Sequence, residues 1–145
     1  MPSVNKSALV EYKAQDMFNI VDDVDKYAEF LPWCGSSTVM SRTADEVRAS
    51  VEISHSGIKK TFTTMNRIQP GKIIEVQLIE GPFKHLHGFW RFEPIGDKGC
   101  KVTLDLEYEF SSKLLGIAIG PVFTQIANTL IDAFCKRAEA IYGKS

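Results

Sequence analysis

The sequence has few cysteines, no long apolar run and almost no net charge. Its three cysteines, Cys34, Cys100 and Cys135, are odd in number and lack C-x-x-C spacing, so neither a disulfide framework nor a zinc site is expected. No run approaches the roughly 20 apolar residues of a membrane span, and residues 1–6 lack the apolar stretch of a secretion signal, which predicts a cytoplasmic protein. The formal net charge of -1 argues against nucleic-acid binding by bulk electrostatics.

The composition that is present fits one domain covering residues 1–145. The chain has 145 residues, of which 44% are hydrophobic and 24% charged. At this length a folded chain hides roughly 70% of the surface that its unfolded form exposes. A core with a small internal cavity therefore needs no metal or disulfide.

Alternation of apolar and polar residues predicts antiparallel strands. It is clearest over residues 100–110 and recurs over residues 47–53, 74–78 and 86–92. One wet face and one buried face indicate an antiparallel sheet, because parallel strands covered on both sides read as continuous apolar runs. Turn residues lie between these segments. With residues 3–12 and 35–42 as further strands, we expect one curved sheet of about seven strands.

Helical spacing appears near both ends of the chain. Met17, Phe18 and Val21 form a short stripe, and Asp25 can cap a second short helix that Pro32 ends. Between residues 123 and 141, apolar residues recur at steps of three and four. This spacing predicts a long amphipathic helix over residues 112–142, about 45 Å in length.

The Gly120-Pro121 pair should bend or restart this long helix, because proline lacks a backbone donor. Residues 114–119, just before the pair, are apolar on nearly every side. Three interpretations stay open for this segment: a core helix, a gate over a pocket, or a patch that contacts a membrane or a protein partner.

The element order predicts an α+β helix-grip fold, in which a curved antiparallel sheet encloses the long C-terminal helix. Two short helices follow the first strand. Where a curved sheet diverges from a straight helix, a gap lined by apolar side chains opens, and such a gap is a natural small-molecule site.

Three segments carry a family resemblance: residues 27–34 (YAEFLPWC), residues 81–92 (GPFKHLHGFWRF) and residues 111–138. The last includes Leu114-Leu115-Gly116, Gly120-Pro121-Val122-Phe123 and Asp132-Ala133-Phe134. Together they resemble the coenzyme Q-binding and ribosome association toxin group of START-like proteins, once called oligoketide cyclases. The resemblance covers nearly the whole chain, and none of the segments is a catalytic signature.

This resemblance implies a helix-grip fold and an apolar ligand, with ubiquinone or a related isoprenoid as the expected class and no required cofactor. Bacterial members are described as toxins that bind the large ribosomal subunit and prevent subunit joining, whereas mitochondrial relatives support respiration. The expected partners are therefore a hydrophobic small molecule, the large ribosomal subunit, an antitoxin protein and, transiently, the periphery of the inner membrane.

Candidate pocket residues lie on the sheet, on the long helix and in the loop over residues 30–34. The loop aromatics either line the pocket entrance or plug the core. Tyr108 or Asn66 is a candidate for orienting a quinone head. The predicted lining residues are Phe30, Leu31, Trp33, Phe83, Leu86, Trp90, Phe92, Tyr108, Ile117, Phe123, Ile126, Leu130 and Phe134.

No catalytic residue and no metal site are predicted. Cys34 has no histidine nearby in sequence. His85 and His87 share one side of a strand but would need a third ligand, and His55 belongs to a distant turn. An enzyme of the polyketide cyclase or dehydrase type is the alternative hypothesis, and it would need an acid–base pair in the pocket.

Bases in the middle of the chain predict a basic strand face. Lys59, Lys60, Lys84, Arg91 and Lys101 could contact rRNA phosphates, and a solvated charged face is the alternative. Phe89 points to the same side as the histidines, so it is either an exposed contact residue or a sign that the sheet is covered there.

Overall fold

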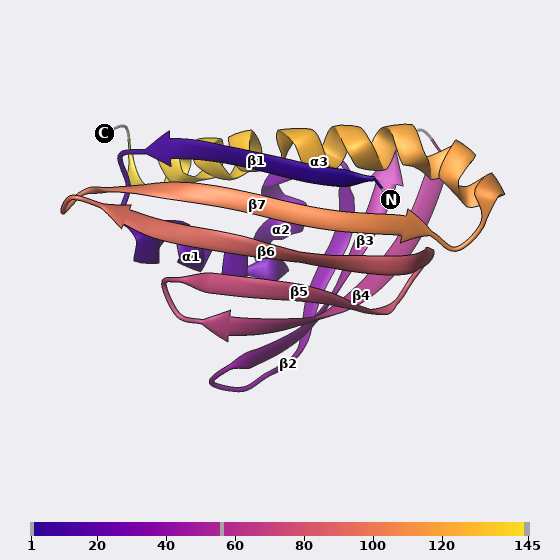
Figure 1. Ribbon diagram of the computed structural model, residues 1–145, viewed down its shortest axis with the longest axis horizontal. Coiled ribbons are helices and arrows are strands. Elements are labelled where there is room, and N and C mark those ends of the chain that lie inside the picture. The colour runs from indigo at the N-terminus through magenta and orange to yellow at the C-terminus, as the bar shows by residue number, and fades with distance from the viewer. Residues whose placement is uncertain (1, 56, 144–145) are drawn as a thin grey trace.

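The computed structural model describes residues 2–55 and 57–143, which form one curved sheet and a long helix (Figure 1). The elements in chain order are β1 (Ser3–Val10), α1 (Ala14–Asp22), the 3-10 helix η1 (Val24–Lys26), α2 (Tyr27–Phe30), β2 (Cys34–Arg42), β3 (Glu46–His55), β4 (Ile58–Gln69), β5 (Ile73–Glu80), β6 (Phe83–Ile95), β7 (Gly99–Phe110) and α3 (Lys113–Tyr142). The predicted α+β helix-grip class is confirmed.

The sheet has seven strands in the order β1-β7-β6-β5-β4-β3-β2, and every neighbouring pair is antiparallel. Strands β2 to β7 follow one another as a meander, and β1 pairs with β7 at the far edge. The crossover from β1 to β2 contains α1, η1 and α2. Figure 1 shows α3 running along the inside of the curved sheet.

The inward face of the sheet follows the alternation seen in the sequence. On β7, Cys100, Val102 and Leu104 are at most 2% exposed, and the residues between them are more exposed. The inward residues of β3 from Val47 to Ile53 are likewise buried. These side chains pack toward α3, and their burial is the main favourable term for the fold.

The sequence analysis named six strand segments and expected about seven strands. Strand β4 is the one that it did not name. Its inward positions include Thr64 and Asn66, which are buried and polar. Because two polar residues stand at inward positions, where apolar residues are expected, the sequence of β4 does not alternate regularly between apolar and polar.

Helix α3 is continuous from Lys113 to Tyr142, so the predicted restart at Gly120-Pro121 is wrong, while a bend there stays a prediction. The Ser112 hydroxyl caps the helix by accepting a hydrogen bond from the Leu115 amide at 3.1 Å. Pro121 removes the bond to the carbonyl of Ile117, and both residues lie on the exposed side of the helix. Water can bond the freed carbonyl there, which explains why the helix tolerates proline.

Helix α3 is also long and apolar enough, by length and composition alone, to cross a membrane. Its most apolar 18-residue window has a mean hydropathy of 1.6, and 28% of that window is buried. The sequence analysis expected no such segment because no unbroken apolar run approaches 20 residues; Gln125 and Asn128 interrupt this one. In this fold the apolar stripe of α3 contacts the sheet, with Ile119, Phe123 and Phe134 at most 5% exposed.

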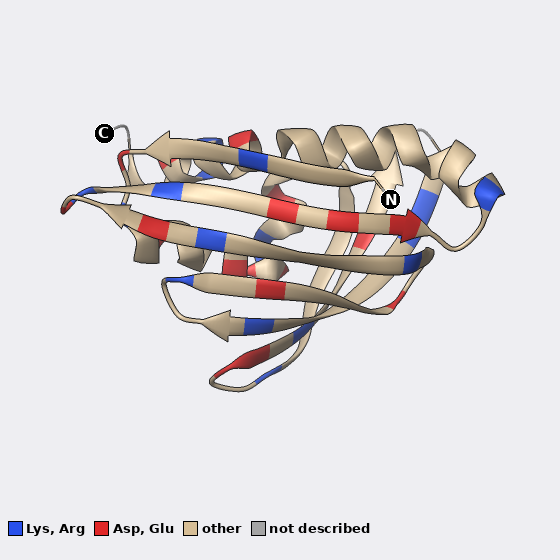
Figure 2. Cartoon of the chain, viewed as in Figure 1, with Lys and Arg blue, Asp and Glu red and all other residues tan. Residues whose placement is uncertain are grey.

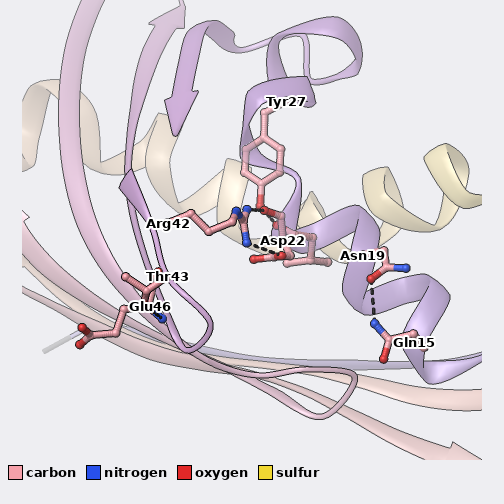
Figure 3. Close-up of polar contacts among 8 residues, drawn as sticks. Gln15, Asn19, Asp22, Tyr27, Arg42, Thr43 and Glu46 are labelled. Atoms are coloured by element: carbon pink, nitrogen blue, oxygen red, sulfur yellow. Dashed lines mark hydrogen bonds and ion pairs between the residues drawn. The ribbon is translucent and has the colours of Figure 1, made fainter. Parts of the chain in front are cut away.

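Polar contacts hold the short helices together and join them to the sheet (Figure 3). Arg42 at the end of β2 forms an ion pair with Asp22 at 2.8 Å. The Tyr27 hydroxyl donates to the carbonyl of Val21. The predicted capping role of Asp25 is wrong: its carboxylate accepts a hydrogen bond from the Val39 amide of β2 at 2.7 Å. Asp25 therefore ties the crossover to the sheet edge.

Candidate ligand-binding cavity

A cavity of about 120 Å³ lies between α3 and the concave face of the sheet. On α3 its wall is a single stripe, Phe123, Ile126, Ala127 and Leu130, spaced as one helix face. The crossover contributes Val21, Val24, Tyr27 and Trp33. The sheet contributes inward residues of five strands: Ala49, Val51, Ile53, Phe62, Thr64, Asn66, Ile74, Val76, Leu86, Gly88, Trp90, Leu104 and Leu106.

The structure brings part of the predicted pocket set together around this cavity. The predicted residues that line it are Trp33, Leu86, Trp90, Phe123, Ile126 and Leu130. They come from the α2–β2 loop, from β6 and from α3, so the inference of a gap between sheet and helix locates the cavity correctly. Their role in ligand binding stays a prediction.

Phe83 and Tyr108 do not line the cavity, contrary to prediction. They pack in an aromatic cluster with Phe110 and Phe123, where Phe83 stacks on Phe110 with ring centroids 5.1 Å apart. The Tyr108 hydroxyl is bonded to the Thr124 hydroxyl at 2.7 Å. Tyr108 is thus a core residue with a satisfied hydroxyl, because inward direction alone does not separate a cavity wall from a packed cluster.

Leu31, Phe92 and Phe134 are likewise core residues and not cavity wall, and Phe30 is half-buried against the same core. Phe134 meets Phe30 and Trp90 edge-on, with ring centroids 5.7 and 5.3 Å apart. Phe92 packs on Phe18 of α1, and Leu31 is 1% exposed beneath the crossover. The crossover helices fill this part of the sheet, and a sequence pattern does not show where they dock.

Ile117 lies outside the cavity altogether. It is 69% exposed, and its neighbour Leu114 is 76% exposed. Helix α3 turns this face away from the sheet, while Ile119 and Phe123 point inward. The first two turns of α3 therefore carry an exposed apolar surface, which fits the patch interpretation of residues 114–119; the gate stays a prediction.

The polar groups of the cavity wall are few. Thr64 and Asn66 are its buried polar side chains, and the Thr64 hydroxyl donates to the Asn66 carbonyl oxygen Oδ1 at 2.9 Å. The wall residues that the structure describes include no Asp, Glu, His, Lys or Arg. Asn66 was one of two sequence candidates for orienting a head group, and it is the one that reaches the cavity.

Tyr27 of the cavity wall and the three cysteines are held in their neutral forms. Burial raises the pKa of the Tyr27 phenol, and the charges of Asp22 and Asp23 raise it further. Burial also raises the pKa of the Cys34 and Cys135 thiols, and that of Cys100 to about 11. A thiol with a raised pKa is a poor nucleophile at neutral pH.

The outer face of the sheet is mixed in charge and not basic (Figure 2). Arg91 pairs with Asp105 at 2.5 Å and Lys84 with Glu109 at 3.8 Å. The bases singled out in the sequence end at Lys101, near the start of β7, and the acids later in β7 lie beside the bases of β6. Phe89 is half-buried, and the Arg91 guanidinium lies 4.8 Å from its ring centroid.

The five predicted rRNA-contact residues do not share one surface. Antiparallel pairing places Lys59, Lys60 and Lys84 at the end of the sheet where β4 and β6 begin, with Arg91 and Lys101 toward the other end. Lys113 opens α3 at the first of these ends, and the sequence analysis did not single it out. Within residues 2–55 and 57–143, no ion pair neutralises Lys59, Lys60 or Lys113. We call Lys59, Lys60, Lys84 and Lys113 the lysine end.

The histidines form no metal site in the described part of the chain, where no group of three or more His, Cys, Asp or Glu side chains converges. The His87 Nε2 atom lies 2.8 Å from a Glu75 carboxylate oxygen. His87 also meets Phe89 edge-on at 5.1 Å between ring centroids. These contacts account for His87 as part of the outer face.

Comparisons with known proteins agree with this architecture. A family model described as polyketide cyclase / dehydrase and lipid transport matches residues 10–135. The ribosome association toxin RatA of Vibrio cholerae is 45% identical over 144 residues, covering 99% of this chain and 100% of that protein. RatA of Escherichia coli K12 is 39% identical over 142 residues, 98% of this chain and 90% of that protein. The chain belongs to this family, in its ribosome association toxin group.

A more distant relative is the mitochondrial coenzyme Q-binding protein COQ10 homolog B of Xenopus laevis, 28% identical over 144 residues, 97% of this chain and 59% of that protein. Among solved structures, an 18 kDa protein of Caulobacter crescentus is 30% identical, with a TM-score of 0.76 over 99% of each chain. A Thermus thermophilus protein has a TM-score of 0.81 at 19% identity, over 96% of this chain and 98% of that one. The Streptomyces aromatase/cyclase Zhui has a TM-score of 0.76 at 16% identity, over 99% of each. The last two share the fold alone.

Proposed function

We propose that this chain is a non-enzymatic binding protein that holds an apolar, quinone-type isoprenoid lipid in its cavity. The observation that carries the proposal is a concave wall of aliphatic and aromatic side chains with Thr64 and Asn66 as its buried polar groups. Burial of apolar ligand surface would drive binding, at about 25 cal/mol per Å² before the costs of association. The coenzyme Q-binding relative supports the choice of ligand class.

The cavity is too small to hold a whole isoprenoid lipid without enlarging. Its volume of about 120 Å³ suits a single ring, since an apolar cavity of about 150 Å³ can hold benzene. Ligand pockets usually measure roughly 300–1,000 Å³. An isoprenoid tail therefore needs part of the wall to move outward, and we propose that the first turns of α3, with Leu114 and Ile117 exposed, move and contact a membrane when lipid is exchanged.

Organic extraction of the purified protein followed by mass spectrometry tests ligand binding. A co-purifying quinone or isoprenoid at near-stoichiometric amount is expected. Repeated recovery of no lipid, together with no uptake of added ubiquinone, would overturn the proposal. Protein expressed with Ala127→Trp, which fills the cavity from α3, is the matched control and should carry no lipid.

Two observations favour a binding protein over an enzyme of the cyclase type. The cyclases that resemble the chain do so at 16% identity, which carries the fold and no chemistry. Cyclisation and dehydration need an acid and a base at the substrate. The described wall offers a phenol committed to Val21, the Thr64 hydroxyl and the Asn66 amide, and it has no carboxylate, imidazole or amine. Turnover of an aromatic polyketide by the purified protein would contradict the non-enzymatic part of the proposal.

A second function, association with the large ribosomal subunit, is supported by relatives named ribosome association toxin that match nearly the whole chain at 39% and 45% identity. We propose the lysine end as the surface that contacts rRNA phosphates, because three of its four side chains lack an acidic partner among the described residues. An antitoxin partner and the cytoplasmic location stay predictions of the sequence.

Sucrose-gradient profiles after overexpression test this second function. Free subunits should rise, and the combined change Lys59→Glu, Lys60→Glu and Lys113→Glu should abolish the rise. The matched control is Lys98→Glu with Lys101→Glu, which reverses charge at the other end of the sheet. An unchanged profile for the unaltered protein contradicts the function, and equal loss in both variants contradicts the surface.

A further inference from the structure

Thr64 and Asn66 are unusual for their position in the sheet. They are 6% and 9% exposed and are the buried polar side chains of the part of the chain that the structure describes. Their pairing partners on β3 and β5 are apolar: Asn66 lies between Val47 and Val76, and Thr64 lies between Ala49 and Leu78. A Val or Leu at either position would fit this surface better, since burying an amide is costly unless it is hydrogen-bonded.

The hydrogen bond within the pair satisfies only part of the Asn66 amide. The Thr64 hydroxyl donates to Oδ1 at 2.9 Å, and no hydrogen bond to the protein uses the Nδ2 hydrogens within residues 2–55 and 57–143. Among the described residues, every fully buried side-chain nitrogen or oxygen has a hydrogen-bond partner. The unbonded Nδ2 atom of Asn66 is therefore not fully buried. Because Asn66 lines the cavity, its two N–H donors are open to the cavity.

The wall around these donors limits what they can bind. The described wall carries no charged side chain, so a carboxylate, phosphate or ammonium group would be buried without a counter-charge. A neutral group that accepts hydrogen bonds meets no such cost. The Thr64 bond fixes the amide with its nitrogen toward the cavity, which reduces the ordering cost of binding such a group.

We infer that Asn66 is the residue that selects the head group, by donating from Nδ2 to a carbonyl oxygen of a neutral ligand, and that Thr64 positions it. The ligand class is a neutral carbonyl compound with an apolar body, such as an oxidised quinone, and excludes fatty acids and phospholipids. This inference rests on the proposed ligand binding, and it identifies the residue that recognises the head group.

The test compares two probes on the whole protein: ubiquinone with a two-isoprene tail, and the benzene hydrocarbon that bears the same tail but no oxygen. Affinities are measured by equilibrium dialysis. Asn66→Leu should weaken ubiquinone binding about tenfold while leaving the hydrocarbon bound as tightly or more tightly, because a neutral hydrogen bond in a buried site has roughly this effect. Thr64→Val should weaken ubiquinone about threefold through loss of amide orientation.

Thr63→Val is the matched control, since Thr63 lies one residue away on the outer face of β4 and should change neither affinity. Retained binding of the hydrocarbon shows that the leucine variant is folded and that its cavity is intact. If the unaltered protein binds neither probe, the proposed function itself fails. If it binds both probes equally and Asn66→Leu leaves ubiquinone unaffected, lipid binding stands and the role of Asn66 is wrong. Binding of the hydrocarbon lost in parallel with ubiquinone would make Asn66 a structural residue only.

Discussion

The two faces of the sheet are built on different interactions. The inner face is packed by aromatic and aliphatic side chains in two buried clusters, with the cavity where packing is incomplete. The outer face is held by ion pairs between neighbouring strands, such as Arg91 with Asp105 and His87 with Glu75. Burial should therefore supply most of the stability, while exposed ion pairs supply little of it and leave the outer surface free to vary.

The largest contrast is expected between two phenylalanines on opposite faces. Phe134 is 1% exposed and contacts Tyr27, Phe30 and Trp90. Phe134→Ala should lower the free energy of unfolding by about 3–5 kcal/mol through lost burial and a new cavity. Phe89→Ala on the outer face should cost about 1 kcal/mol, the scale of a surface cation–π contact. Urea unfolding measures the free energy of unfolding of both variants. Equal losses would contradict the claim that the inner face supplies most of the stability.

Alkaline pH should act on the inner face. Burial raises the pKa of Cys100 from 9.0 to about 11, so the fold favours the protonated thiol. The unfolded chain releases this proton near its ordinary pKa. The stabilisation is thus complete below pH 9 and is lost as pH rises to about 11, an effect on the order of 2 kcal/mol.

Urea unfolding between pH 8 and pH 11 checks this, with Cys100→Ala as the comparison. The alanine variant should show a smaller decline across this range, whatever its stability at pH 8. The same decline in both proteins would show that the buried thiol does not carry the effect.

The smallest effect is expected from the outer ion pairs. The side chains of Arg91 and Asp105 are 38% and 37% exposed, so solvent screens their attraction. Arg91→Gln should cost about 0.2–1 kcal/mol at low salt and less in 1 M NaCl. A loss that is larger and insensitive to salt would show that the two faces are not so different.

Regular alternation and helical spacing were sufficient to predict the fold. Strand β7 and helix α3 have one apolar face each, and burial of that face requires the helix to lie against the sheet. Strand β4 was not predicted, because Thr64 and Asn66 stand at inward positions where apolar residues are expected. The departure from the pattern therefore marks the cavity, which is where binding is proposed.

The candidate site was predictable only in part. Inward direction follows from periodicity, so Leu86, Trp90 and Ile126 could be assigned to the wall. Whether an inward aromatic lines a space or fills one depends on docking of distant elements: α2 covers Phe134, and α3 covers Tyr108. Charge pairing across β6 and β7 is set by register, which composition does not contain.

The most direct test of the account uses the two tryptophans of the chain, Trp33 and Trp90, which both line the cavity. Quinones accept electrons from excited indoles and quench their fluorescence at contact. Titration with short-tailed ubiquinone should give saturable quenching at one ligand per chain, with most of it retained in Trp33→Phe because Trp90 is buried deeper, at 5% exposure. Quenching that is linear with concentration and no stronger than that of free tryptophan would contradict the claim that this cavity binds a quinone.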